Sequence, residues 1–168
     1  MIKYFEDIMA VKCAYSCTVG EAKAAVDARE KDTRNYCTVE ALHTLLKITY
    51  EHAYILLHRA GRKDNHDFYI TPYLAEQSWA EPKFRAYYAG NKAYQLYGRP
   101  ICRSLTQVKK DFPFGRYLLI SPTHALALVN GMVYDNMTDR KRYTISSIWQ
   151  IFPERFVKEM VEEISANG

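Results

Sequence analysis

Apolar residues recur at helical spacing in two neighbouring segments of the N-terminal half of the chain. Residues 38–47 carry four apolar side chains on one helical face, and Cys37 stands directly before them. These four side chains are Val39, Leu42, Leu45 and Leu46. Residues 49–60 repeat the pattern, and Gly61 follows where a left-handed residue ends many helices. The pattern predicts two successive helices joined by a very short turn, with Cys37 at the start of the first.

Capping signals mark two shorter helices on either side of this pair. Residues 18–26 are rich in alanine, and Thr18 and Glu21 have the spacing of a capping box. A peripheral helix is therefore expected there. Residues 104–111 predict a short capped helix that stops before Pro113, because the residue before a proline disfavours helical backbone.

The C-terminal segment has the pattern of an amphipathic helix. Pro153 occupies the first turn of a helix predicted over residues 153–166, a position that proline tolerates. Five of its apolar residues are expected to face inward: Phe156, Val157, Met160, Val161 and Ile164. In contrast, residues 62–100 show no sustained period and predict a long, partly irregular segment with room for one short helix.

Strand-length apolar runs are confined to the C-terminal half. The dipeptide Asn130-Gly131 between two of them is a strong signal for a two-residue hairpin turn. The predicted strands cover residues 116–121, 123–129, 132–134 and 143–149. The expected fold class is therefore α+β, with N-terminal helices packed on a C-terminal antiparallel sheet in a single domain over residues 1–168.

Composition narrows the function classes. The net charge of +4 is spread along the 168 residues, which does not indicate a nucleic-acid binder. No apolar run approaches the roughly 18 residues that cross a bilayer, and Glu6 and Asp7 argue against a secretory signal. A soluble cytoplasmic protein is expected, and in a reducing compartment its four cysteines should be free thiols: Cys13, Cys17, Cys37 and Cys102.

Three residues have the pattern of a catalytic triad. A thiolate at a helix start is stabilised by unpaired backbone donors and the helix dipole, which favours Cys37 as a nucleophile. His124 begins a predicted strand, and the Asn130-Gly131 turn folds the next strand back beside it. Counting across that turn pairs Leu126 with Asp135, about two positions from His124. Asp135 is thus expected to orient His124, which would serve as the base for Cys37.

This order of Cys, helix, long segment, His on a strand and acid on the next strand resembles the papain-like cysteine peptidase superfamily. The local papain signature around the nucleophile is absent. The chain is most similar to small phage- and prophage-encoded papain-like proteins of unassigned substrate. The segments that carry this similarity are residues 34–42, 49–54, 60–63, 112–117, 124–127 and 130–135. Together they cover about residues 34–63 and 105–151.

The resemblance implies a papain-like cysteine hydrolase, most simply a peptidase or isopeptidase, in the cytoplasm of a phage host. It would act on a peptide or protein substrate through a thioester intermediate, with no cofactor and no metal. Two residues depart from the family pattern, since Tyr36 stands where an acidic residue is usual and Glu40 where a basic one is frequent. These departures bear on substrate preference rather than on the triad.

The donors for a tetrahedral oxyanion are less defined by the sequence. The backbone N–H of Cys37 is one candidate, and Asn35 is the best side-chain candidate. Papain-like enzymes carry a glutamine upstream, where this chain has Lys31. An ordinary turn role for Asn35 is therefore an equal alternative.

Other polar clusters favour structural interpretations. Cys13 and Cys17 could bind a metal with Cys102 and a histidine, but a single Cys-x3-Cys pair is a poor zinc signal. His66 lies in a polar loop where it could contact substrate, although solvation is its expected state. The remaining histidines, His43, His52 and His58, occupy helical positions, and a surface position is expected for His43. The cluster Arg140-Lys141-Arg142 is expected to be a solvated turn.

Two alternatives to hydrolysis remain open at this point. One is a binding or host-takeover protein that keeps the fold with little turnover and uses residues 62–100 to contact a host protein. The other is a transferase or deamidase that uses the same thiolate.

Overall fold

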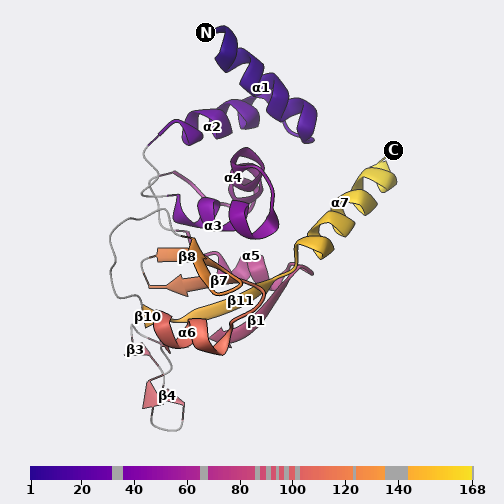
Figure 1. Cartoon of the computed structure of the whole chain (residues 1–168). Helices are drawn as coiled ribbons and strands as arrows, with labels where there is room; N and C mark the ends of the chain where they lie inside the picture. The colour runs from indigo at the N-terminus through magenta and orange to yellow at the C-terminus, as the bar shows by residue number, and fades with distance from the viewer. Residues whose placement is uncertain are drawn as a thin grey trace.

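The computed structural model places two groups of helices around one antiparallel sheet (Figure 1). It describes residues 1–31, 36–64, 68–85, 88–89, 92–93, 95–96, 99–100, 103–122, 124–134 and 144–167. The helices are α1 (Ile2–Ala14), α2 (Val19–Arg29), α3 (Cys37–Leu46), α4 (Tyr50–Arg59), α5 (Thr71–Ala75), α6 (Leu105–Asp111) and α7 (Pro153–Asn167). The sheet strands are β1 (Ala80–Arg85), β7 (Arg116–Ser121), β8 (His124–Val129), β9 (Met132–Tyr134) and β11 (Ser147–Ile151). Short strand pairs are β2 (Tyr88–Ala89) with β3 (Lys92–Ala93), β4 (Gln95–Leu96) with β5 (Arg99–Pro100), and β6 (Arg103–Ser104) with β10 (Thr144–Ile145).

The sheet has the order β1-β11-β7-β8-β9, and every neighbouring pair is antiparallel. The predicted α+β class is confirmed by this combination of helices and sheet. The strands β7 and β8 lie inside the sheet and are buried on both faces. These two strands therefore form the platform on which helices pack from both sides.

One face of the sheet carries the N-terminal helices in two layers. Helix α3 lies directly on β8 and β7, α4 packs beside α3, and α1 and α2 lie beyond α4 (Figure 1). The residues that β8 presents to this layer include Ala125 and Ala127, which are both buried in the core beneath α3. Because alanine side chains are small, the backbone of α3 can approach the backbone of β8 closely.

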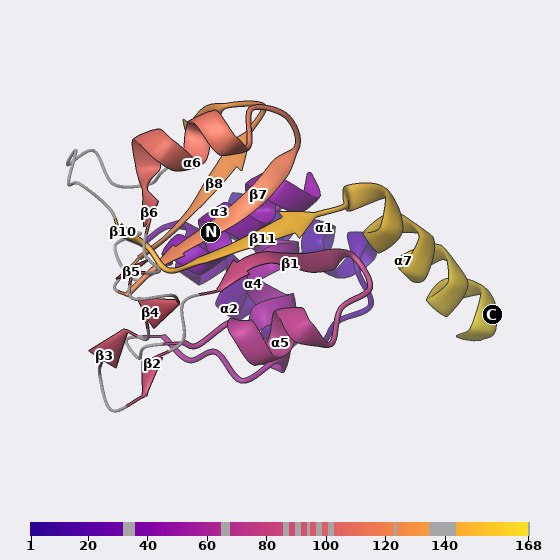
Figure 2. The ribbon, with the colours of Figure 1, turned by 90° about the horizontal axis from the view of Figure 1, so that it is seen from below.

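The opposite face of the sheet packs against α6, as the view from below shows (Figure 2). The residues of β7 and β8 alternate between the two cores, because successive side chains of a strand point to opposite faces. Tyr117, Leu119, Leu126 and Leu128 belong to the α6 side, together with Val108 of α6 itself. The sheet is therefore covered on both sides at the strand that begins with His124.

Several local predictions are confirmed. Thr18 caps α2, with its side chain accepting from the N–H of Glu21 and the Glu21 carboxylate accepting from the N–H of Thr18. Asn130 and Gly131 have φ values of 48° and 79°, which form the tight turn of the predicted hairpin. The register that the turn predicts is present, with Val129 opposite Met132 and Leu128 opposite Val133.

The prediction that α7 turns five apolar residues inward holds for Phe156 and Met160 and is wrong for the other three. Phe156 is buried, but Val157, Val161 and Ile164 are 55%, 56% and 68% exposed. Helix α7 packs on the core through its first turns and then extends away from the sheet (Figure 1). The sequence period predicts an apolar stripe correctly, but only the start of that stripe meets a partner surface.

Long-range pairing also changes the expected elements. The predicted strand over residues 143–149 is instead two strands, β10 and β11, separated by Ser146. Within the segment 62–100, α5 fits the expected short helix, while β1 pairs with β11 at the edge of the main sheet. Helix α1 was not predicted from the short apolar start of the chain.

Candidate active site

Cys37 is the first residue of α3, as the apolar pattern predicts. Its neighbour Tyr36 is the N-cap residue, and no side chain caps this helix start. The first backbone N–H groups of a helix have no partner within the helix. At α3, the backbone N–H of Thr38 helps to lower the pKa of the Cys37 thiol. The helix start is thus arranged around a thiol rather than closed by a cap.

His124 lies next to this thiol, although it is far from Cys37 in the sequence. It opens β8 after the connection from Ser121, whose hydroxyl donates to the His124 carbonyl at 3.1 Å. The His124 ring hydrogen-bonds to the Cys37 sulfur, and the backbone N–H of Ala125 does so as well. Both contacts depend on the close packing of α3 on β8.

The electrostatics of the pair favour the thiolate. Burial raises the pKa of Cys37, but the hydrogen bond and charge of His124 and the N–H groups of Ala125 and Thr38 lower it by more. The net pKa of Cys37 is therefore below its ordinary value. Since the thiolate is the nucleophilic form of cysteine, more of this side chain is reactive at neutral pH than in an unperturbed cysteine.

A cavity of about 330 Å³ opens beside the sulfur. Four of its lining residues come from α3, at positions that share one helical face: Cys37, Glu40, Ala41 and Thr44. The opposite wall is formed by Ala125, Val133 and Tyr134 from the β8–β9 hairpin. A carbonyl carbon brought to the sulfur would therefore lie between α3 and the edge of the sheet.

Two of the predicted site residues, Asn35 and Asp135, lie outside the described residues. The structure brings together Cys37 and His124. The register that motivated Asp135 is present up to the pair Ala127 and Tyr134, the last one described.

A buried network under Tyr36 is a positioning feature that the sequence did not indicate. Arg62 is 2% exposed, and its guanidinium lies 4.7 Å from the centre of the Tyr36 ring and 3.1 Å from Asp64. The Tyr54 hydroxyl donates to Asp64 at 2.9 Å. Burial raises the pKa of Asp64, but hydrogen bonds from Tyr54 and Arg62 lower it by more. This network fixes the residue that precedes Cys37.

The other end of α3 is also held by a distant residue. Arg116 at the start of β7 donates to the carbonyl of Leu45 at 2.8 Å and also to that of Thr44. These carbonyls belong to the last turn of the helix, where no partner exists within the helix. Tertiary contacts therefore set the position of α3 at both of its ends.

The remaining histidines have structural surroundings. His43 is half-buried rather than at the surface, with its ring bonded to the Ile48 carbonyl at the end of α3. His58 faces Asp64 at 3.4 Å. Within the described ranges, no group of three or more histidine, cysteine and acidic residues could hold a metal ion. His66, Cys102, the cluster 140–142 and the Cys13 side chain lie outside the described part.

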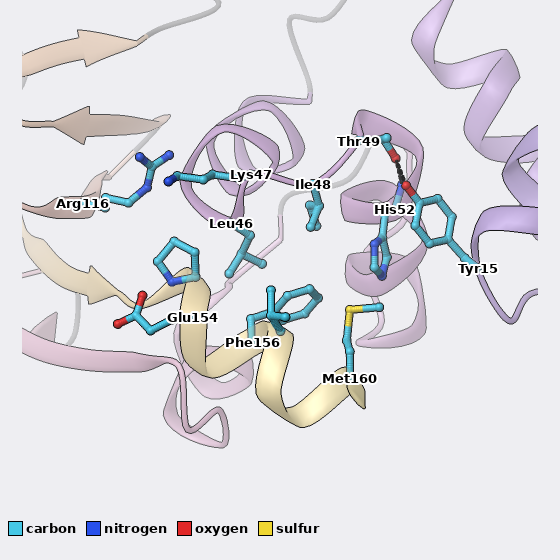
Figure 3. Close-up of a pocket in the computed structure, with 12 residues that line it drawn as sticks. Tyr15, Leu46, Lys47, Ile48, Thr49, His52, Arg116, Glu154, Phe156 and Met160 are labelled. Atoms are coloured by element: carbon cyan, nitrogen blue, oxygen red, sulfur yellow. Dashed lines mark hydrogen bonds between the residues drawn. The ribbon is translucent and has the colours of Figure 1, made fainter. Parts of the chain in front are cut away.

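A larger cavity, of about 590 Å³, lies between α7 and the ends of α3 and α4 (Figure 3). Most of its lining is apolar, and its histidine, His52, packs between Tyr15 and Phe156 at ring distances of 4.0 and 5.6 Å. Burial lowers the pKa of His52 to about 4, so the ring is neutral at physiological pH. Among the described residues that line this cavity, none is a cysteine or serine. Its size therefore does not make it the better candidate for catalysis.

Comparisons with known proteins add no relative to this description. No family model, no curated protein and no solved structure matched the chain. Among the described helices, none has the length and apolar character that would span a bilayer.

Proposed function

We propose that this chain is a papain-like cysteine hydrolase that cleaves an amide or thioester bond, most simply as a peptidase or isopeptidase. The observation that carries the proposal is the Cys37 thiol at the start of α3, hydrogen-bonded to His124 and with a lowered pKa. A nucleophile and base in this relation are the minimum for covalent acyl transfer. The cavity beside the sulfur gives a substrate access to it.

The proposed reaction has two half-reactions. The Cys37 thiolate attacks the substrate carbonyl carbon, and the oxyanion that forms accepts hydrogen bonds from the Cys37 N–H and from Asn35. His124 donates its proton to the leaving amine as the C–N bond breaks, which leaves a thioester on Cys37. His124 then takes a proton from water as the water oxygen attacks the thioester carbonyl carbon. The C–S bond breaks, the acyl group leaves as the carboxylic acid, and His124 returns the proton to the Cys37 sulfur.

The third member of the proposed triad is Asp135, which follows β9 directly in the chain. Its role would be to fix the orientation and tautomer of His124. Replacing Asp135 with Asn should lower kcat/KM at least about tenfold, because the imidazolium loses its counter-charge. The matched variant Asn136→Ala should stay near the wild-type value. If Asn136→Ala is instead the damaging change, the assignment of the third residue is wrong.

Alkylation with iodoacetamide tests the nucleophile. In the folded protein at neutral pH, Cys37 should react faster than Cys13, Cys17 and Cys102, as read peptide by peptide by mass spectrometry over a short time course. The His124→Ala variant should lose this advantage, because the hydrogen bond and charge that lower the pKa of Cys37 are gone. An activity-based cysteine probe should label the same peptide.

A second candidate is an interaction protein without turnover, directed at a host protein. The observation that favours it is the exposed apolar stripe of α7, formed by Val157, Val161 and Ile164. If Cys37 alkylates no faster than the other three thiols, and His124→Ala behaves as wild type, the hydrolase proposal fails and this second candidate is favoured.

A further inference from the structure

The cavity beside Cys37 has an acidic wall. Glu40 follows Cys37 by three positions on α3, so the two side chains are neighbours on the helix surface, about 5–6 Å apart at their Cβ atoms. Glu40 is half-buried. Among the described residues that line the cavity, it is the one that carries a carboxylate.

The Glu40 carboxylate has no ion-pair or hydrogen-bond partner among the described residues, whereas Glu21, Glu51 and Glu81 each pair with an arginine. Nearby Thr44 uses its hydroxyl to donate to the backbone carbonyl of Glu40 at 3.1 Å, so this hydroxyl does not donate to the carboxylate. A half-buried carboxylate without a partner attracts a cation more strongly than one that is paired or fully hydrated.

The negative charge of Glu40 also acts on the neighbouring Tyr50 hydroxyl. Burial and then the charge of Glu40 raise the pKa of Tyr50, whose buried hydroxyl has no hydrogen-bond partner among the residues that the structure describes. The other described lining residues besides Cys37 are neutral or apolar, including Ala41, Ala125 and Val133. Among the described lining residues, a positive group on a substrate would therefore meet the Glu40 carboxylate and no cationic side chain.

We propose that Glu40 makes this cleft selective for substrates that carry a lysine or arginine side chain, or a free amine, within one residue of the bond that Cys37 attacks. The inference rests on the proposed function for its substrate, and it assigns Glu40 as a binding residue that discriminates by charge. Selection of this kind raises the affinity for cationic groups and lowers it for anionic ones.

Fluorogenic peptide amides that differ at one position test the preference. Three substrates carry Lys, norleucine or Glu next to the cleaved bond. In the wild type, kcat/KM should follow the order Lys, norleucine, Glu, with about tenfold between the first two. In Glu40→Gln, the ratio of Lys to norleucine should fall toward one, and in Glu40→Lys the Glu substrate should become preferred.

A control variant changes the net charge of the protein by the same amount as Glu40→Gln, but far from the cavity. Glu162 lies on the exposed part of α7, which extends away from the sheet, so Glu162→Gln should keep the wild-type ratio (Figure 1). If Glu40→Gln keeps it as well, the assignment of Glu40 is overturned.

A second measurement does not depend on turnover. Methanethiosulfonates react with a thiolate as the sulfur attacks the sulfenyl sulfur, the S–S bond of the reagent breaks and methanesulfinate leaves. Cys37 should react faster with a trimethylammonium-bearing reagent, relative to a sulfonate-bearing one, in the wild type than in Glu40→Gln. The ratio should differ about tenfold and shrink in the wild type as salt rises. If Glu40→Gln does not fold, the salt dependence of the reagent ratio in the wild type still tests the proposal.

The two failures can be told apart. If no peptide is cleaved and Cys37 shows no enhanced alkylation, the hydrolase proposal fails, while the reagent-charge ratio still judges Glu40. If peptides are cleaved but neither ratio responds to Glu40→Gln, the hydrolase stands and the charge selectivity is wrong. A reagent ratio that is independent of both Glu40 and salt also contradicts it.

Discussion

Cys17 and Cys37 both stand beside a helix start, yet the two thiols differ in their chemistry. At α2, which follows Cys17, the capping box of Thr18 and Glu21 uses the free backbone donors. Burial and the Glu21 charge raise the pKa of Cys17. At α3 no side chain caps the helix, and although burial raises the pKa of Cys37, His124 and two N–H groups lower it by more. Of these two cysteines, the pKa is therefore lowered at the one whose helix start has no side-chain cap and has a histidine beside it.

The two helix starts also differ in what holds them. The α2 start is fixed by residues three positions apart, through bonds of 3.0 Å in each direction. The α3 start is fixed by Arg62 and Asp64, which reach Tyr36 from the chain beyond α4. At Cys37, a buried tertiary network takes the place of a local side-chain cap.

The largest expected difference between the two cysteines is in turnover. Cys37→Ala should lower kcat/KM by at least about a thousandfold, because the covalent route is lost. Cys17→Ala should remain within about twofold of wild type, because its thiol lies at a capped helix start. The measurement is hydrolysis of a fluorogenic peptide amide by both variants. If Cys37→Ala kept more than about a tenth of the wild-type kcat/KM, the predicted difference between Cys37 and Cys17 would be wrong.

The next effect is on stability and concerns the network under Tyr36. Arg62→Met should lower the free energy of unfolding by about 3 kcal/mol or more, because it leaves the Asp64 carboxylate without its buried counter-charge. The control Arg155→Met breaks an exposed pair with Glu81 at 2.8 Å and should cost about 1 kcal/mol or less. Urea unfolding of both variants measures the difference. Equal costs would mean that the α3 start does not depend on this network.

A smaller effect is expected at the capped start. Thr18→Ala should lower the free energy of unfolding by about 1 kcal/mol, the usual value of a side-chain cap. Thr106→Ala makes the same change at an exposed position within α6 and should stay within about 0.5 kcal/mol. Cys37 alkylation should be unchanged in both variants. Slower alkylation in Thr18→Ala would show that the two helix starts are coupled.

The smallest effect is the acid sensitivity of the α2 start. Hydrogen bonds from Arg59 and Thr18 lower the pKa of Glu21 to about 2 from an ordinary 4.5. Because the folded-state pKa is the lower one, this stabilisation is complete above about pH 4.5 and is lost as the pH falls toward 2. Its size should be below about 1 kcal/mol, since the side chain is partly exposed and screened by solvent. Thermal melts over this range should show a flatter pH dependence for Glu21→Gln than for the control Glu76→Gln.

Much of the local structure could be predicted from the amino-acid order alone. The capping box at Thr18, the apolar face of α3 and the Asn130-Gly131 turn each depend on residues within a few positions of one another. Such patterns act through helix and strand periodicity and through backbone dihedral preferences, which are properties of short segments. The position of Cys37 at a helix start and the hairpin register after His124 were predictable for this reason.

Which of these helices and strands contact one another depends instead on packing between distant segments. The strand β1 lies in the main sheet because it pairs with β11, a segment distant in the sequence. The residues of β1 alone do not indicate this pairing. The apolar stripe of α7 is visible in the sequence, but whether Val161 is covered depends on where the helix points. The contact of Cys37 with His124 likewise depends on Ala125 and Ala127, whose small side chains allow α3 to pack closely on β8. Packing and burial bring together residues that are far apart in the chain, and the hydrophobic period of one segment does not indicate which other segment it will contact.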